Sequence, residues 1–206
     1  MIQTIDDLPL PPSDLNNRLL PIQTFAEGNI LFRIHNTDYH PVFFGKSLPH
    51  RFDAPIPYGV MYAGIDRHVA LRETIFRGEV DNLIIARNKL SGMLARQSIS
   101  CLSANRVLKL VQAYDDGLSK IGATSSISRE DERSYTQKWS LALWQHPDFV
   151  DGIMYRSRLD ENRFCVALYS DRIDGVLFHQ AKEELSSEHF SPILMEIIDT
   201  YGIGLI

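Results

Sequence analysis

Five polar residues stand in or beside apolar segments of this sequence, and their types can do chemistry together. They are Arg33, Arg51, Tyr62, Glu73 and Ser157. An unpaired charge is costly in apolar surroundings, so each charged member needs an internal partner or a ligand. The two arginines and the glutamate could form a buried ion network. The five residues come, however, from strand ends, a loop and a helix start, and pockets are built from such separate pieces.

The chemistry that these side chains could perform is the binding and cleavage of a nucleotide. Two guanidinium groups, those of Arg33 and Arg51, can clamp a diphosphate through bidentate, charge-assisted hydrogen bonds. A tyrosine face can stack on a flat heterocycle. A single carboxylate can hold a ribose hydroxyl and stabilise an oxocarbenium-like centre, while a serine hydroxyl orients a sugar or an amide. The set suits a nucleotide diphosphate with a labile N-glycosidic bond.

The stretch Arg51–Glu73 must position three of these residues. After a turn with two prolines and a glycine, the apolar run Tyr58–Ala63 predicts a buried strand that carries Tyr62. Asp66 is placed to cap a helix over Asp66–Arg77, and a glycine follows as a stop signal. The stretch therefore reads as the rim of a pocket for an anionic ligand.

The other two residues are expected at the ends of strands. Alternating apolar residues predict a strand over Gly28–His35, which contains Arg33. The loop Asn36–His50 that follows holds several aromatic residues and is expected to fold back over part of the structure. Runs over Asp151–Ser157 and Arg163–Tyr169, separated by a turn, predict a hairpin with Ser157 at the end of its first strand.

Early strands, a helical middle and late strands favour an α+β fold in one compact domain. We divide the chain into an N-terminal extension, 1–27, and a catalytic domain, 28–206. Further strands are expected over Val80–Ala86, Ser100–Ser103 and Val176–His179, and Lys89–Ser100 is a weakly patterned connection. Helices are expected over Arg106–Leu118 and, at the end of the chain, over Pro192–Tyr201. Another helix is expected to be capped by Ser128, with Asp131 in its first turn, and to end before Pro147.

Composition excludes several classes of protein. The chain has 206 residues and a net charge of −5, so no direct nucleic-acid partner is expected. No apolar stretch is long enough to span a bilayer, and the first residues lack the pattern of a secretory signal, so no membrane partner and a cytoplasmic location are expected. Cys101 and Cys165 lack metal-ligand spacing and are expected to be buried free thiols. No Rossmann or Walker glycine motif is present.

The chain resembles the RES-domain family, the toxins of RES–Xre toxin–antitoxin systems. The resemblance runs roughly from Ile30 to the end. It rests on LFRI with Arg33, HRFD with Arg51, VMYAGIDRHVALRE with Tyr62 and Glu73, KWSLALWQHPDFVDGIMYRSR with Ser157, and the closing IIDTYGIGL. Any one of these motifs would be weak evidence alone, but together and in this order they are fairly specific.

This resemblance implies a β core like that of ADP-ribosyltransferases, flanked by helices, and an activity that consumes NAD+. Members of the family split the nicotinamide–ribose bond with phosphate or water as acceptor. By the same resemblance, Arg33 and Arg51 would hold the phosphates and Tyr62 would pack against the nicotinamide end. Glu73 would be the catalytic carboxylate, and Ser157 would position the ribose or the nicotinamide.

The resemblance also implies partners: an Xre-type helix-turn-helix antitoxin and a second copy of the chain in a homodimer. It implies no metal and no bound cofactor, with NAD+ as substrate and inorganic phosphate as a candidate co-substrate. Two other functions stay open, a protein ADP-ribosyltransferase using the same pocket and a non-catalytic nucleotide-binding module. The roles of the extension 1–27 and of the 36–50 loop are not assigned.

Overall fold

The computed structural model describes residues 8–46, 50–54, 56–77, 84–129 and 133–206. In these parts of the chain, one eight-stranded sheet has the order β1-β6-β7-β8-β3-β2-β5-β9, and β10 pairs with β4 in a small second sheet. The strands are β1 (Ile22–Phe25), β2 (Ile30–Asn36), β3 (Val60–Gly64), β4 (Ile84–Ile85), β5 (Gln97–Ala104), β6 (Leu108–Ala113), β7 (Gly152–Arg156), β8 (Phe164–Tyr169), β9 (Leu177–Glu184) and β10 (Gly204–Leu205). The helices are the 3-10 helix η2 (Leu15–Asn17) and the α-helices α1 (Arg67–Thr74), α2 (Arg87–Leu94), α3 (Asp116–Ile121), α4 (Ser126–Arg129), α5 (Arg133–Trp144), α6 (Ser170–Ile173) and α7 (Ser191–Thr200).

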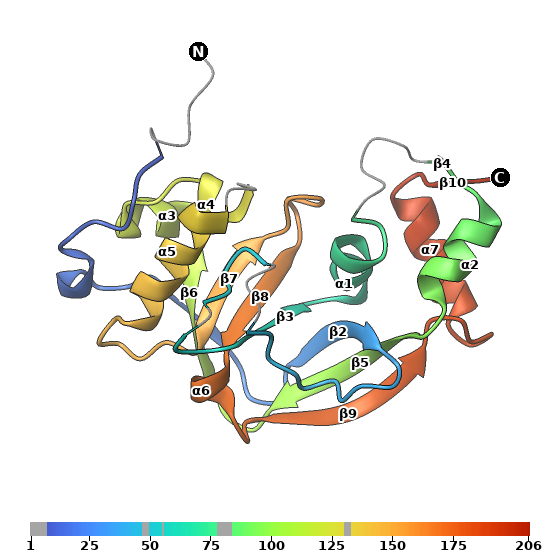
Figure 1. Cartoon of the computed structure of the whole chain (residues 1–206), viewed down its shortest axis with the longest axis horizontal. Coiled ribbons are helices and arrows are strands. Elements are labelled where there is room, and N and C mark those ends of the chain that lie inside the picture. The colour runs from blue at the N-terminus through green and yellow to red at the C-terminus, as the bar shows by residue number, and fades with distance from the viewer. Residues whose placement is uncertain (1–7, 47–49, 55, 78–83, 130–132) are drawn as a thin grey trace, which may run out of the picture.

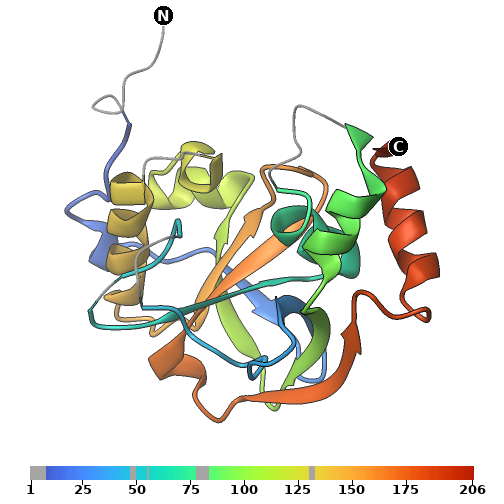
Figure 2. The ribbon, with the colours of Figure 1, turned by 45° about the vertical axis from the view of Figure 1, so that its right-hand side comes forward.

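Two groups of helices flank this sheet at opposite ends. Helices α3, α4 and α5 gather beside β6 and β7, whereas α1, α2 and α7 gather at the other end (Figure 1). Figure 2 shows the same separation after a turn of 45°. Trp139 and Leu143 of α5 share one hydrophobic core with β6, β7 and β8, and the second helix group shares another with Ile34 and Ile99 of β2 and β5. The predicted α+β domain, a large sheet flanked by helices, is confirmed.

Neighbouring strands of the main sheet pair through several residues each, except β2 and β3. Strand β2 pairs with β5 along its whole length, from Ile30 to Asn36, and β3 pairs with β8 from Val60 to Gly64. Between β2 and β3 themselves, the antiparallel register in the described residues has one pair, Phe32 with Gly64. Beyond that pair the two strands diverge, so backbone pairing joins the two halves of the sheet at one position in the described residues. Side chains also join them, since Leu31 of β2 and Met61 and Ala63 of β3 belong to one hydrophobic core.

The N-terminal residues take part in this fold. Strand β1 pairs with β6 at the edge of the main sheet, and Leu8, Leu15 and Leu20 are buried in the core around α5. Within the described residues, Cys101 and Cys165 are both free thiols; Cys165 is buried, as expected, whereas Cys101 is only partly buried. No helix in the described ranges is long and apolar enough to cross a membrane.

The region expected to be a helix over Arg106–Leu118 is instead a strand, and the prediction was wrong. Residues Leu108–Ala113 form β6 between β1 and β7, and the short helix α3 follows. Leu110 and Val111, adjacent in sequence, belong to different hydrophobic cores. Because β6 is buried on both faces, its apolar residues do not alternate, and their spacing resembled that of a helix.

Three further expectations either need correction or concern residues outside the described ranges. The weak pattern over Lys89–Ser100 contains most of α2 and the start of β5, so it is not a connection. Ser128 lies inside α4 rather than before a helix, and Asp131 lies outside the described residues. Of the strand expected over Val80–Ala86, residues 80–83 also lie outside, and the described part, β4, pairs with β10.

The remaining expectations hold with shifted ends. The hairpin of β7 and β8, the strands β2 and β3 and the closing helix α7 are present. The expected strand Val176–His179 is longer, because β9 continues to Glu184 along β5. The expected short strand Ser100–Ser103 is the middle of β5. Asp66 caps α1, since its Oδ1 accepts a hydrogen bond of 2.9 Å from the backbone N–H of Val69.

Candidate functional site

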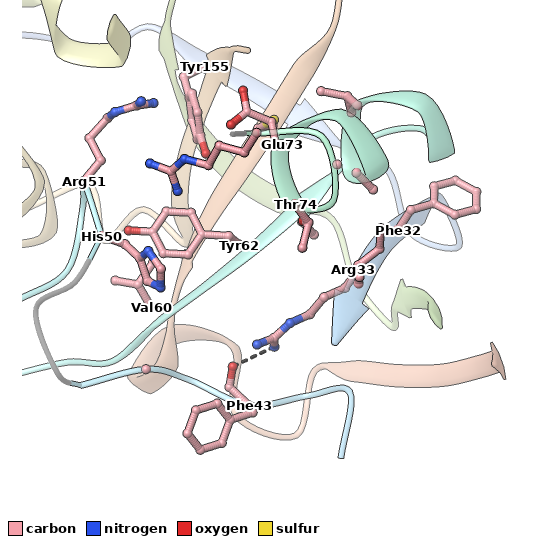
Figure 3. Close-up of a pocket in the computed structure, with 18 residues that line it drawn as sticks. Phe32, Arg33, Phe43, His50, Arg51, Val60, Tyr62, Glu73, Thr74 and Tyr155 are labelled. Atoms are coloured by element: carbon pink, nitrogen blue, oxygen red, sulfur yellow. Dashed lines mark hydrogen bonds between the residues drawn. The ribbon is translucent and has the colours of Figure 1, made fainter. Parts of the chain in front are cut away.

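A cavity of about 430 Å³ lies where β2 and β3 diverge (Figure 3). Strands β2 and β3, helix α1, the segment before β3 and the strands β7 and β8 all contribute to its wall. Four of the five residues selected from the sequence line it: Arg33, Arg51, Tyr62 and Glu73. The fifth, Ser157, is buried and lies behind Glu73 rather than on the wall. The sequence pattern therefore found residues that the fold brings together.

Arg33 reaches the cavity from β2 and is held by the loop that follows the strand. Its Nη1 donates hydrogen bonds to the backbone carbonyls of Pro41 (2.8 Å) and Phe43 (2.6 Å), the second of which is drawn in Figure 3. The loop thus folds back over Arg33, as its aromatic residues suggested. Burial lowers the pKa of Arg33 to about 10, so the guanidinium remains charged at neutral pH.

Arg51 is placed by a short segment that Tyr62 and α5 hold in position. The Tyr62 hydroxyl donates to Oδ1 of the buried Asp53 (3.0 Å) and accepts from the backbone N–H of Phe52 (2.8 Å). From the other side, Thr136 of α5 donates its hydroxyl to the Arg51 carbonyl at 2.5 Å. The Arg51 guanidinium lies 5.8 Å from the centroid of the Tyr155 ring, within the range of a cation–π contact.

Glu73 lies in the last turn of α1 and faces the cavity. Its Oε1 accepts a hydrogen bond of 2.5 Å from the hydroxyl of Ser157. Gly64 lets α1 approach the sheet this closely, because a Cβ there would lie 2.6 Å from a methyl group of Val69 and 2.9 Å from the backbone nitrogen of Ala70. Figure 3 shows the Glu73 carboxylate near the Tyr155 ring, with Tyr62 between the side chains of Arg51 and Arg33.

The electrostatic character of the cavity is set by three arginines and one glutamate on its wall. The third arginine is Arg77, which follows α1. Among the residues that the structure describes, no carboxylate lies within 4.0 Å of the guanidinium of Arg33, Arg51 or Arg77. An internal ion network of these arginines with Glu73 is therefore not what the structure has. The arrangement suits an anionic ligand, because no described carboxylate neutralises the charge of these three guanidinium groups at close range.

Residues 30–188 match the model of the RES domain family. This match covers more than half of the chain. The chain belongs to the RES domain family.

Two similar proteins accompany this match. A Sinorhizobium fredii protein named "Probable toxin y4kH" is 26% identical to this RES domain chain over 123 residues, which are 56% of this chain and 89% of that protein. A chain in the crystal structure of the M. tuberculosis MbcT-MbcA toxin-antitoxin complex has a TM-score of 0.64 and 11% identity, and the match covers 91% of this chain and 98% of that chain. At 11% identity, the likeness concerns the fold alone.

The RES domain cavity also contains residues that the sequence did not single out. Tyr155 of β7 and Cys165 of β8 line it, and Arg77 adds the third guanidinium. Burial raises the pKa of Tyr155 well above its ordinary value, and the charges of Arg51, Glu73 and Arg77 also act on its hydroxyl. Arg77 lies beyond the end of α1 at Thr74, so helical spacing from Glu73 does not account for its place on the wall.

The sequence analysis also did not select Asp53, because a single aspartate two residues after Arg51 is typical of an exposed turn. It is fully buried, and its Oδ2 accepts a hydrogen bond of 3.1 Å from the backbone N–H of His50. Tyr155 and Cys165 gave no signal either, since both stand within apolar strands where they resemble ordinary core residues.

Proposed function

We propose that this protein is a toxin-type enzyme that consumes NAD+ by cleaving the bond between nicotinamide and ribose. The observation that carries the proposal is one cavity with a carboxylate held by a serine at 2.5 Å and arginines on either side of a tyrosine. Membership of the RES domain family supports it. The resemblance of that family's β core to ADP-ribosyltransferases is consistent with the same chemistry.

Arg33 and Arg51 would bind the two phosphates of the dinucleotide. Both guanidiniums lack a described carboxylate partner, and such groups bind phosphate with charge-assisted hydrogen bonds. The Arg33 guanidinium is fixed by two backbone carbonyls, and the backbone from which Arg51 projects is fixed by Tyr62 and Thr136, so part of the site is ordered before the ligand arrives. Preorganisation of this kind reduces the entropy lost on binding. Tyr62 would pack its ring against the nicotinamide end.

Glu73 would stabilise the positive charge that develops on the ribose as the glycosidic bond breaks. In this step, the bond from C1 of the ribose to the nicotinamide nitrogen breaks and the nitrogen keeps the electron pair. Nicotinamide therefore leaves as a neutral molecule. An oxygen of phosphate or water then bonds to C1, and with water one proton is released. A fixed carboxylate beside an oxocarbenium-like centre lowers the barrier electrostatically. Ser157 would hold that carboxylate in place.

The cellular role that we propose is that of a toxin controlled by an antitoxin. The similar Sinorhizobium fredii protein is named a toxin, and the chain with the similar fold was crystallised in a toxin-antitoxin complex. A partner that covers the cavity would prevent NAD+ loss. An Xre-type antitoxin and a homodimer belong to the same proposal.

The first experiment measures NAD+ consumption by the purified protein, freed of any inhibitor, with and without inorganic phosphate. We expect NAD+ to disappear, with ADP-ribose 1″-phosphate or ADP-ribose as the product. Labelled NAD+ transferred to a polypeptide would favour the protein ADP-ribosyltransferase. Binding of NAD+ without turnover would favour the non-catalytic module, and an absence of both binding and turnover would overturn the proposal.

Two substitutions with matched controls test the assigned residues. We expect Glu73→Gln to lower kcat by about 10²–10³-fold, the size of effect seen when a group that stabilises transition-state charge is removed. Arg51→Ala should lower kcat/KM to a similar extent. Glu27→Gln and Arg87→Ala change the same residue types at exposed positions outside the cavity and should leave both constants unchanged. Equal effects in test and control variants would count against the site.

A further inference from the structure

Tyr201, near the C-terminal end of the chain, contacts two parts of the structure that hold Glu73. It follows α7 and lies outside residues 30–188, the segment matched by the family model. Its hydroxyl donates to Oδ2 of Asp160 at 2.8 Å, and the guanidinium of Arg72 lies 5.3 Å from its ring centroid. Arg72 precedes Glu73 in α1, and Asp160 lies in the turn that begins at Ser157.

The turn after β7 directs the proton of Ser157 toward Glu73. The Ser157 hydroxyl oxygen accepts hydrogen bonds from the backbone N–H groups of Leu159 and Asp160, each at 3.1 Å. A serine hydroxyl has two acceptor lone pairs and one proton. With both lone pairs occupied, its proton is left for the carboxylate of Glu73, which it meets at 2.5 Å. The conformation of this turn therefore decides where Glu73 is held.

The carboxylate of Asp160 fixes that conformation. Its Oδ2 accepts from the Tyr201 hydroxyl and from Nε of Arg163 (3.0 Å), while its Oδ1 accepts from the backbone N–H of Asn162 (3.2 Å). Two donors share Oδ2, so loss of the Tyr201 hydroxyl would leave the Asp160 side chain with Asn162 and Arg163 as its hydrogen-bond partners among those described here. The link from the turn to α7 would then be lost.

Arg163 extends the same network to the start of α1. Its Nη1 lies 2.9 Å from Oδ2 of Asp66, whose Oδ1 caps the helix through the N–H of Val69. Tyr201 therefore acts on the Glu73 helix from two sides. One route runs through Asp160 and Arg163 to the cap of the helix, and the other runs directly from its ring to Arg72 in the last turn.

We infer that Tyr201 is a positioning residue for Glu73, acting through Asp160 and the Ser157 turn; the inference rests on the proposed NAD+ cleavage. Among the described residues, the hydroxyl donates to Asp160, and neither Asp160 nor Tyr201 lines the cavity, so the hydroxyl would set the placement of the carboxylate and not the binding of the dinucleotide. Burial raises the pKa of Tyr201, so the phenol keeps its proton and donates to Asp160 throughout the neutral range.

The test compares Tyr201→Phe with a matched loss of a tyrosine hydroxyl elsewhere, Tyr114→Phe. The first variant keeps the ring over Arg72 and loses only the bond to Asp160, while the second loses a bond of 3.3 Å to Gln23 away from the cavity wall. We expect Tyr201→Phe to lower kcat about tenfold with KM nearly unchanged, less than the roughly hundredfold that a misplacement of 1 Å can cost. Tyr114→Phe should leave both constants unchanged.

A double variant tests the route through Asp160. If Tyr201 acts through that carboxylate, Tyr201→Phe combined with Asp160→Asn should lower kcat no further than Asp160→Asn alone. Thermal unfolding of each variant identifies a general loss of folded protein. An unchanged kcat in Tyr201→Phe, or multiplicative effects in the double variant, would overturn the inference while NAD+ loss by the unmodified protein still supported the proposed function. No NAD+ loss by the unmodified protein would instead overturn the function.

Discussion

The hydroxyl of Tyr62 is already engaged within the protein, and this limits what it can do for a ligand. It donates to the carboxylate of Asp53 and accepts from the N–H of Phe52, so one face of the ring is what remains for the cavity. The residue expected from the sequence to contact the ligand thus has a second task. It holds the segment from which Arg51 projects.

Tyr62→Phe separates these two tasks, because it keeps the ring and removes the hydroxyl. We expect KM for NAD+ to rise about tenfold while kcat changes little, since Arg51 loses its fixed position but Glu73 does not. Loss of a hydrogen bond to a buried carboxylate should also lower the free energy of unfolding by about 1–3 kcal/mol. Steady-state kinetics and chemical denaturation measure the two effects. An unchanged KM would show that the hydroxyl does not hold Arg51.

His35, next to Arg33 in sequence, is a buried group whose protonation is linked to stability. Its Nδ1 lies 2.8 Å from the Asn36 carbonyl, which can only accept, so Nδ1 carries the proton. Its Nε2 is then the acceptor for the Ser100 hydroxyl at 2.9 Å. The neutral ring therefore satisfies both contacts without placing a charge in this partly buried position beside Arg33.

This arrangement predicts a loss of stability at mildly acidic pH. Burial, followed by the positive charges of Arg33, Lys182 and His179, lowers the pKa of His35, although the Asn36 carbonyl opposes the shift. The unfolded chain takes up a proton near pH 6.5 and the folded protein only at lower pH. The contribution of His35 is thus complete above about pH 6.5 and is lost as the pH falls toward its folded value.

The measurement is the free energy of unfolding between pH 7.5 and 5.5, compared with that of His35→Gln. The native protein should lose stability faster than the variant on acidification, by at most about 1.4 kcal/mol per pH unit for one proton. His189→Gln, at an exposed position, is the control and should follow the native protein. Parallel curves for native protein and His35→Gln would contradict the prediction.

At the scale of elements, local signals in the sequence identified residues that line one cavity better than they identified the secondary structure. The cap of α1 at Asp66 and the turn between β7 and β8 are fixed by residues close together in the sequence, and both were predictable. Strand β6 was not, because its burial on both faces depends on β1 and β7, which are distant in the sequence. The contact between Ser157 and Glu73 likewise depends on tertiary structure, although both residue types were recognised.

An ion pair between the buried Asp151 and the partly exposed Arg106 lies at the start of the parallel pair of β6 and β7. Asp151 accepts hydrogen bonds from Nη1 and Nη2 of Arg106, at 2.9 and 2.7 Å, and from the N–H of Lys109 at 2.8 Å. The side chain of Asp151 is 4% exposed and that of Arg106 is 42% exposed. Asp151 therefore joins the two strands where no turn connects them.

Asp151→Asn should destabilise the fold, because the NH2 group of asparagine would face an N–H donor of Arg106 or Lys109 that now bonds to a carboxylate oxygen. We expect a loss of about 2–3 kcal/mol, below the cost of breaking a fully buried pair since Arg106 can be hydrated. Asp116→Asn is the matched control, as it changes an exposed ion pair with Lys120 and should cost less than about 1 kcal/mol. Urea denaturation measures both. A similar loss of stability in the two variants would show that Asp151 contributes no more to the fold than an exposed ion pair does.

At the scale of the whole molecule, charge is distributed unevenly. The chain has a net charge of −5, yet the wall of its cavity has three arginines and one glutamate. A composition that argues against general binding of nucleic acid is therefore compatible with local binding of a small anion. The overall charge of the sequence did not predict this, since the arginines are far apart until the chain folds.

A ligand that spans the cavity should stabilise the folded protein. We expect NAD+ to raise the melting temperature of the Glu73→Gln variant, in which turnover is slow, with a gain of about 2.7 kcal/mol at a concentration 100 times Kd. Differential scanning calorimetry measures the shift. Adding Arg33→Ala to the same variant should remove most of it, because one phosphate contact is lost. A shift that survives this change would place the dinucleotide elsewhere.

The sheet has one weak seam, the single register pair of Phe32 with Gly64 between β2 and β3. Arg33 projects from one side of that seam, while Glu73 packs with α1 against the end of β3 and Arg51 is tied to Tyr62 on the other. A dinucleotide bound by all three residues would therefore link the β2 side to the β3 side, where the two strands have little backbone pairing. Amide hydrogen exchange in both β2 and β3 should slow when the dinucleotide is bound, while exchange in β6 and β7 stays the same.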